Sequence, residues 1–155
     1  MLCYICRQTG EQMFEILHDL HIDAKPSEVF SLISKPKGLN KWWTLDAEGS
    51  PEKGERYRFF FSEEYDWAGV VTKAEIEDYI EWEMKDCDEN WNGTLVGFEL
   101  SPTDSGTQVY FYHKNWKKTN DEFRQSSYCW ATYLRLLKRY IEHDEFVPYH
   151  HRNNA

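Results

Sequence analysis

The sequence predicts an α+β domain in which a curved, six-stranded antiparallel sheet wraps around a long C-terminal helix. Three observations support this fold class. One strand-like segment precedes two short helical segments, and five short aromatic-rich segments with brief connections follow them. The last segment, residues 120–144, has an apolar face that covers roughly 160° of a helix. So broad a face suits the concave side of a curved sheet better than a seam between two helices.

The first element, residues 14–23, reads FEILHDLHID and alternates between apolar and polar side chains. A period of two residues predicts a half-buried strand. The side of this strand that faces the core is expected to carry Phe14, Ile16, His18, Leu20 and Ile22.

Two short helices are expected next. Pro26 is well placed in a first helical turn, and the helix is expected to end at Pro36 and Gly38. Residues 39–44, LNKWWT, are expected to add one more helical turn. Its paired Trp42 and Trp43 would give one ring to the core and one to the margin of the core.

Five segments rich in aromatic and β-branched residues then predict five strands. Their connections are too brief for crossovers, so antiparallel hairpins are expected. The predicted strands cover residues 56–62, 67–76, 79–85, 94–100 and 107–116. Thr119 and Glu122 fit a capping box, which places the start of the final helix near Asn120 and its end near Asp144.

Composition limits the partners of the protein. The 155 residues are expected to form a single domain, 1–155, with residues 1–12 as an N-terminal segment and 145–155 as a tail. A formal net charge of −9 argues against a nucleic-acid partner, because phosphate binding needs clustered Lys and Arg. No apolar segment approaches the length of a membrane span or of a signal-peptide core, so we expect a cytoplasmic protein.

The four cysteines do not predict a metal site. Cys3 and Cys6 form one close pair, but no second pair stands at zinc-ligand spacing, and Cys87 and Cys129 are isolated. We expect reduced thiols, no metal and no cofactor.

Three stretches resemble a known family. They are residues 22–30 (IDAKPSEVF), residues 39–43 (LNKWW) and residues 130–142 (WATYLRLLKRYIE) with its Pro148-Tyr149 tail. In these stretches and in the order of its elements, the chain resembles the helix-grip superfamily of START-related and birch-pollen-allergen-like domains (SRPBCC). Its details are similar to the branch named after the activator of the heat-shock-protein ATPase. The resemblance implies a helix-grip fold. Members of the superfamily include carriers of lipids and other hydrophobic molecules, cyclases acting on polyketides, and co-chaperones, so the fold alone leaves the function open.

A pocket lined by aromatic side chains is predicted between the sheet and the C-terminal helix. A dry void of about 300 Å³ would cost roughly 7 kcal/mol, comparable to the stability of a whole domain. Ligand, water or side chains must therefore fill the space. The candidates for ligand contact are His18, Trp43, Phe59, Trp82, Phe111, His113, Trp130, Tyr133 and Leu137. The alternative for the rings is core packing, and for both histidines it is a structural hydrogen bond.

No catalytic motif is evident in the sequence, so no catalytic residue is assigned. Glu81 and Glu83 alternate with Ile80, Trp82 and Met84 and are expected to face solvent. The preferred function is binding of a small hydrophobic or aromatic molecule. The alternatives are a cyclase- or hydrolase-type enzyme acting on a bound hydrophobic substrate, and a co-chaperone-like module with a protein partner.

Overall fold

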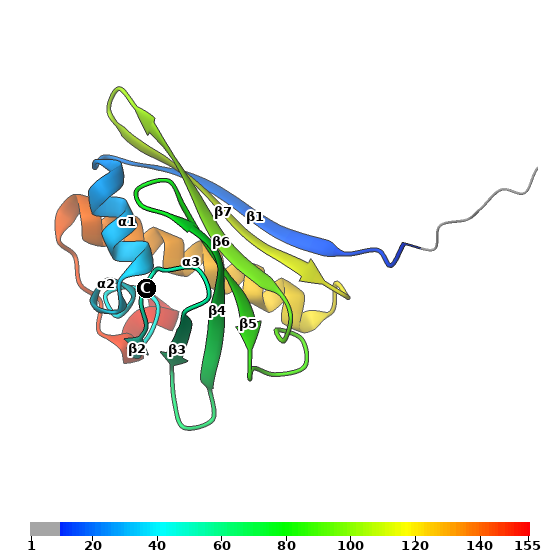
Figure 1. Ribbon diagram of the computed structural model, residues 1–155. Coiled ribbons are helices and arrows are strands. Elements are labelled where there is room, and N and C mark those ends of the chain that lie inside the picture. Colours follow the sequence, from blue (N-terminus) through cyan, green and yellow to red (C-terminus); the bar gives the residue numbers. More distant parts are fainter. Residues whose placement is uncertain (1–9) are drawn as a thin grey trace, which may run out of the picture.

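Antiparallel strands form one curved sheet with a long helix along its concave side, in a computed structural model that describes residues 10–155 (Figure 1). The strand order is β1-β7-β6-β5-β4-β3-β2, so β2 to β7 form a meander and β1 closes against β7. The strands are β1 (Phe14–Ile22), β2 (Asp46–Glu48), β3 (Arg56–Phe60), β4 (Asp66–Glu75), β5 (Tyr79–Lys85), β6 (Leu95–Thr103) and β7 (Gly106–Trp116). The fold class is the predicted one.

The strand count differs from the prediction, because residues 10–155 contain seven strands and not six. The additional strand, β2, has three residues and pairs with the end of β3, where Ala47 lies opposite Phe59. A three-residue strand buries a single side chain, here Ala47, and is too short to show alternation.

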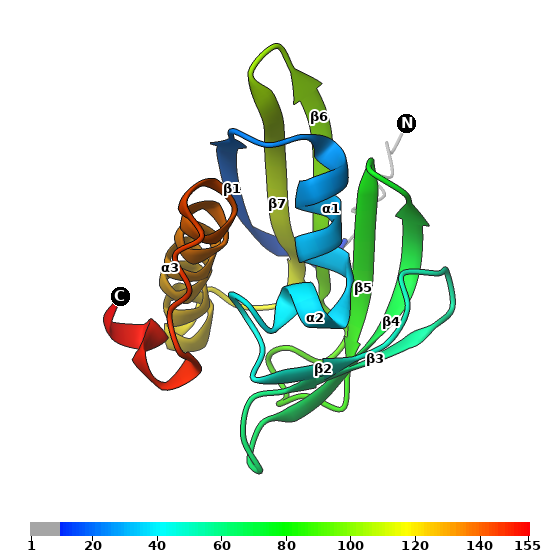
Figure 2. The same ribbon diagram turned by 90° about the vertical axis from the view of Figure 1, so that its left-hand side faces the viewer.

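Helices α1 (Pro26–Ser34) and α2 (Pro36–Leu39) lie within the curve of the sheet, as Figure 2 shows. The first helix ends before Pro36, as expected, and residues 40–43 form a turn, but the second helix begins at Pro36 and not at Leu39. Pro36 occupies the first turn of α2, where a missing N–H costs nothing. Gly38 permits the close approach to α1, since a Cβ atom there would lie 2.5 Å from the carbonyl oxygen of Ser31. The following turn buries Trp42, whose Nε1–H donates to the Leu32 carbonyl.

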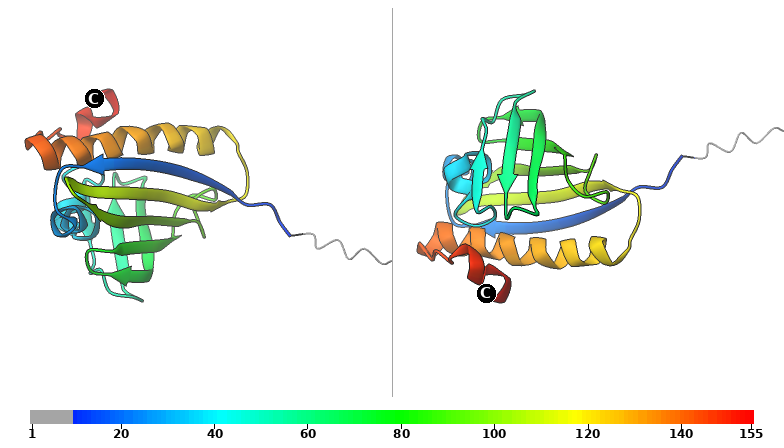
Figure 3. Two further views of the ribbon diagram at one scale, coloured as in Figure 1. Left: turned by 90° about the horizontal axis from the view of Figure 1, so that it is seen from above. Right: turned by 90° about the horizontal axis from the view of Figure 1, so that it is seen from below.

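The C-terminal helix α3 (Asp121–His143) runs beside β1, and both views of Figure 3 show this. Its predicted limits are confirmed, but the predicted capping box is wrong. The cap is Asn120, whose Oδ1 accepts the Phe123 N–H at 3.1 Å. The broad apolar face is confirmed on the inward side, where Trp130, Leu134 and Leu137 are buried.

The convex face of the sheet carries one buried carboxylate. Glu81 was expected to face solvent, yet it is 8% exposed. Its two oxygens accept hydrogen bonds of 2.6 Å from Thr72 and from Tyr112, whose ring lies over Gly97. A neighbouring ring therefore covers a position that alternation assigns to solvent.

No helix within residues 10–155 is long and apolar enough to cross a membrane.

Candidate functional site

A cavity of about 410 Å³ lies where the N-terminal half of α3 meets the β3–β4 hairpin, the loop between β5 and β6, and the C-terminal 3₁₀ helix η1 (Tyr149–Asn154). Its volume is within the range of small-molecule sites. Most of the lining is aromatic. The lining residues are Trp43, Phe61, Tyr65, Trp67, Asp88, Trp91, Glu122, Gln125, Ser126, Cys129, Trp130, Tyr133, Tyr149 and Asn153.

Five of these aromatic side chains contact one another in a closed circuit, which we call the aromatic belt. It consists of Trp43, Phe61, Trp67, Trp91 and Trp130. Consecutive ring centroids are separated by 4.8 to 5.9 Å, the spacing of stacked and edge-to-face aromatic pairs. Trp43, Trp91 and Trp130 are buried and form the inner part, whereas Phe61 and Trp67 are half-buried.

A chain of hydrogen bonds beneath the belt fixes two of its rings. The Nε1–H of Trp130 donates to Nδ1 of His113 at 3.1 Å. Thr94 donates its hydroxyl proton to the Trp91 carbonyl, so its oxygen is free to accept the Nε2–H of His113 at 2.8 Å. This pattern assigns the neutral Nε2–H tautomer to His113. Burial lowers the pKa of His113 to about 3, which keeps the imidazole neutral near pH 7.

Two half-buried carboxylates, Asp88 and Glu122, lie in the cavity wall. Oδ1 of Asp88 accepts the backbone N–H groups of Asn90 and Trp91 at 2.8 and 3.0 Å, which holds the turn that presents the Trp91 ring. Burial raises the pKa of Glu122, and the charge of Asp88 raises it further. Burial also raises the pKa of the Cys129 thiol, so this sulfur is a protonated thiol and a weak nucleophile.

The C-terminal η1 forms one wall of the cavity through Tyr149 and Asn153. The hydroxyl of Tyr133 on α3 donates to Asn153 Oδ1 at 3.1 Å. Arg152, which is 1% exposed, joins η1 to the turn after α2 by donating to the carbonyls of Asn40 and Thr44. It also donates to the carbonyl of Val147, just before η1.

The structure brings three of the predicted ligand contacts together: Trp43, Trp130 and Tyr133 line the cavity. Five others are at most 1% exposed and fill the core instead. They are Phe59, Trp82, Phe111, His113 and Leu137. The centre of the predicted pocket is therefore occupied by side chains, and the cavity lies at one end of α3.

His18, the remaining candidate, lies in a separate groove between β1 and α3, where its Nε2 is 3.2 Å from the carbonyl oxygen of Ser127.

Sequence reasoning missed Phe61, Trp67, Trp91 and the two carboxylates. Trp91 stands in the loop between β5 and β6, and Tyr65 in the turn between β3 and β4. Large aromatic residues in polar loops are a signal for a site, because a loop offers them little burial of its own.

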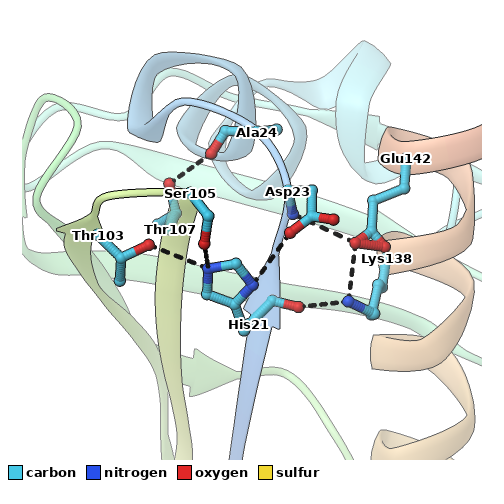
Figure 4. Close-up of polar contacts among 8 residues, drawn as sticks. All are labelled: His21, Asp23, Ala24, Thr103, Ser105, Thr107, Lys138 and Glu142. Carbon is cyan, nitrogen blue, oxygen red and sulfur yellow. Dashed lines mark hydrogen bonds and ion pairs between the residues drawn. The ribbon is translucent and has the colours of Figure 1, made fainter.

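A second polar cluster lies at the far end of β1 (Figure 4). Nδ1 of His21 is 3.2 Å from Asp23 Oδ1, and its Nε2 is 3.0 Å from Thr103 Oγ1 and 3.3 Å from Ser105 Oγ. Lys138 on α3 donates to the His21 carbonyl at 2.6 Å and pairs with Glu142. These contacts tie β1 to the β6–β7 hairpin and to α3, and they set a hydroxyl, an imidazole and a carboxylate in sequence.

Residues 23–142 match the model of a family described as Activator of Hsp90 ATPase homolog 1-like protein. Among solved structures, the Aha1 dimer from Colwellia psychrerythraea is 30% identical, with a TM-score of 0.78 over 85% of this chain and 98% of that chain. Protein SSP2350 from Staphylococcus saprophyticus is 18% identical, with a TM-score of 0.72 over 86% of this chain and 96% of that one. Protein MLL2253 from Mesorhizobium loti is 14% identical, with a TM-score of 0.75 over 86% of this chain and all of that one. The last two show the fold alone. No curated protein sequence matches the chain.

Proposed function

The chain belongs to the family of Activator of Hsp90 ATPase homolog 1-like proteins, and on that premise we propose that it binds a small hydrophobic or aromatic molecule in the cavity beside α3. The observation that carries this proposal is the closed aromatic belt that lines a cavity of about 410 Å³. A cavity lined mostly by aromatic side chains, with some polar groups among them, is typical of a small-molecule site.

The belt gives a ligand a favourable place to bury its surface. Removing about 250 Å² of apolar surface from water contributes roughly 6 kcal/mol, from which the cost of association is subtracted. The inner rings are held by hydrogen bonds from Trp130 to His113 and from Trp91 Nε1 to Ser126. Such a site is largely pre-formed, so little of the binding energy is spent on ordering its walls.

Binding can be tested with a neutral naphthalene probe, 1-naphthylacetamide, and with native mass spectrometry of freshly purified protein. The informative variant is Trp67→Ala, because Trp67 is half-buried and its removal costs the fold less than removal of an inner ring. The matched control is Leu17→Ala, which truncates a side chain that is 57% exposed on the convex face. We expect Trp67→Ala to weaken binding by about ten-fold and Leu17→Ala to leave it unchanged. Absence of binding to the unmodified protein, or equal losses in both variants, would contradict the proposal.

A hydrolase is the second candidate, favoured by the cluster of Ser105, His21 and Asp23 (Figure 4). With its proton on Nδ1, His21 donates to Asp23 and its Nε2 accepts the hydroxyl proton of Ser105. Ser105 Oγ would attack an ester carbonyl carbon while its proton moves to Nε2. The alcohol would then leave with that proton, and a water molecule would release the acid by the same two steps.

The hydrolase candidate is tested with p-nitrophenyl acetate at neutral pH. Ser105→Ala should abolish turnover, whereas Thr103→Val removes the competing hydroxyl and should preserve it. Equal rates for the unmodified protein and Ser105→Ala would exclude this candidate.

A co-chaperone-like role, the third candidate, calls for a contiguous exposed apolar patch. The exposed large apolar side chains among residues 10–155 are spread over β1, β7, α3 and several loops; they are Met13, Leu17, Leu45, Tyr65, Ile76, Tyr110, Tyr128 and Phe146. Leu17 and Tyr110 share a groove that Glu15, Asp19, Glu99 and Lys114 border. This distribution gives less support to a protein partner than the aromatic belt gives to a small ligand.

A further inference from the structure

We propose that the cavity selects an organic cation, an ammonium or amidinium group carried on an aromatic or aliphatic body. This inference rests on the proposed function and adds the charge of the ligand. Its grounds are the charges that line the cavity, the angles between its rings, and the partners that its carboxylates already have.

The charge of the lining is entirely negative. Among the fourteen lining residues, all within the described part of the chain, Asp88 and Glu122 are acidic and none is Lys, Arg or His. An anionic ligand would therefore meet two carboxylates without a compensating cation, and a neutral ligand would leave their mutual repulsion in place. A cation in the cavity is attracted to both carboxylates.

The local contacts leave part of each carboxylate available to a ligand. Asp88 uses Oδ1 to hold the backbone of Asn90 and Trp91, which leaves Oδ2 for another donor. Glu122 stands in the first turn of α3, and the repulsion between it and Asp88 contributes to its raised pKa. Relief of this repulsion is a source of binding energy specific to a positively charged ligand.

The aromatic rings of Phe61, Tyr65, Trp67 and Trp91 are inclined to one another and are not stacked in parallel. The planes of Tyr65 and Trp67 meet at 90°, those of Phe61 and Trp67 at 70°, and those of Trp67 and Trp91 at 45°. Rings that line one cavity at different inclinations can contact a quaternary ammonium group from more than one direction. Each indole or phenol face in contact with the cation contributes about 0.5 to 2 kcal/mol.

Two positive features near the cavity already have local partners. The N-terminus of α3 is capped by Asn120 and carries Asp121 and Glu122 in its first turn, which offset the helix dipole. The guanidinium of Arg152, behind η1, is committed to three backbone carbonyls. The acidic first turn and the burial of Arg152, which is 1% exposed, therefore disfavour an anionic ligand at either feature.

Three probes with a common naphthyl ring test the charge preference by isothermal titration at low ionic strength. They are (1-naphthylmethyl)trimethylammonium, neutral 1-naphthylacetamide and anionic 1-naphthylacetate. We expect the cation to bind about ten-fold more tightly than the amide, and the anion to bind most weakly. Lowering the pH through the raised pKa of Glu122 should weaken binding of the cation and leave binding of the amide unchanged.

The matched variant is the double substitution Asp88→Asn and Glu122→Gln. Both changes keep the shape of the side chain, and the new amide at position 88 retains an oxygen for the two backbone N–H groups. The control Asp121→Asn removes a charge from the same turn of α3, on a side chain that is 99% exposed. The double variant should lose the preference for the cation while its affinity for the amide probe stays the same, and the control should keep that preference.

The outcomes separate the two proposals. Equal affinity for cation and amide, or tightest binding of the acetate, would overturn the cation inference and leave the aromatic-ligand proposal standing. Failure of all three probes to bind would overturn both. Retention of the full preference by the double variant would also overturn the inference, because the carboxylates would then have no part in it.

Discussion

The indole N–H of Trp130 on α3 donates to Nδ1 of His113 on β7, over 3.1 Å, inside the core. This bond joins the C-terminal helix to the sheet and orients an inner ring of the cavity. It also determines which nitrogen of His113 carries the proton, since Nε2 must then donate to Thr94.

The neutral state of His113 makes the protein sensitive to acid. The folded pKa, about 3, is lower than the unfolded value of about 6.5. The contribution of His113 to stability is therefore fully present above pH 6.5 and is lost as the pH falls toward 3, because the unfolded state binds the proton first. At pH 5 the expected loss is about 2 kcal/mol. Urea unfolding at pH 7 and pH 5 measures it, with His113→Phe expected to show a smaller difference. An equal difference in both proteins would argue against this assignment.

Substitutions at Trp130 should separate packing from ligand contact. Trp130→Ala is expected to cost about 3 to 5 kcal/mol. Trp130→Phe keeps a ring but leaves Nδ1 of His113 without its donor, at about 1 to 3 kcal/mol. Leu134→Met, buried nearby on α3, is the packing control and should cost less than about 1.5 kcal/mol.

In these variants, melting curves measure the loss of stability, and titration with 1-naphthylacetamide measures the change in ligand affinity. The affinity should fall for Trp130→Phe and remain unchanged for Leu134→Met. If affinity merely follows stability across the series, Trp130 has a packing role alone.

Arg152 should control both the wall of the cavity and the order of the C-terminal residues. Arg152→Ala removes the donors to Asn40, Thr44 and Val147, and we expect a loss of about 2 kcal/mol or more. The affinity for 1-naphthylacetamide should also fall, because η1 contributes Tyr149 and Asn153 to the cavity. Arg152→Lys keeps the charge without the planar fork and should rescue little. Unchanged hydrogen exchange in residues 149–154 of either variant would contradict this role.

Gly97 should not tolerate alanine. The added Cβ would lie 2.3 Å from Cζ of Tyr112 and would displace the ring that covers Glu81. We expect a loss of about 2 to 4 kcal/mol from the clash and from the Glu81 oxygen that loses its Tyr112 donor. Tyr112→Phe removes the hydroxyl alone and should cost less. Gly10→Ala, where a Cβ meets no atom of residues 10–155 within 4 Å, should leave the free energy of unfolding unchanged in the same chemical denaturation experiment.

The order of elements could be predicted from the sequence, because alternation and helical periodicity are local properties. Residues 14–23 reveal their inward face by alternation, and the limits of α3 follow from polar residues that flank an apolar stripe. The short β2 and the start of α2 at Pro36 escaped prediction, since segments of three or four residues show no period. At the N-terminus of α3, Thr119 and Asn120 are both residue types that cap helices, and the backbone geometry places Asn120 at the cap position.

The sequence by itself determined that this protein has a curved sheet, a helix with a broad apolar face, and a high content of aromatic residues. Only the tertiary structure decided which rings fill the core and which surround the cavity. Phe111 and Trp130 both face inward and contact each other, but of the two only Trp130 also reaches the cavity. The pairing of Ser105 with His21, 84 positions apart, likewise depends on strand register. Periodicity specifies the face of an element on which a side chain lies. Its depth and its distant partners follow from how the sheet curves and how the elements pack.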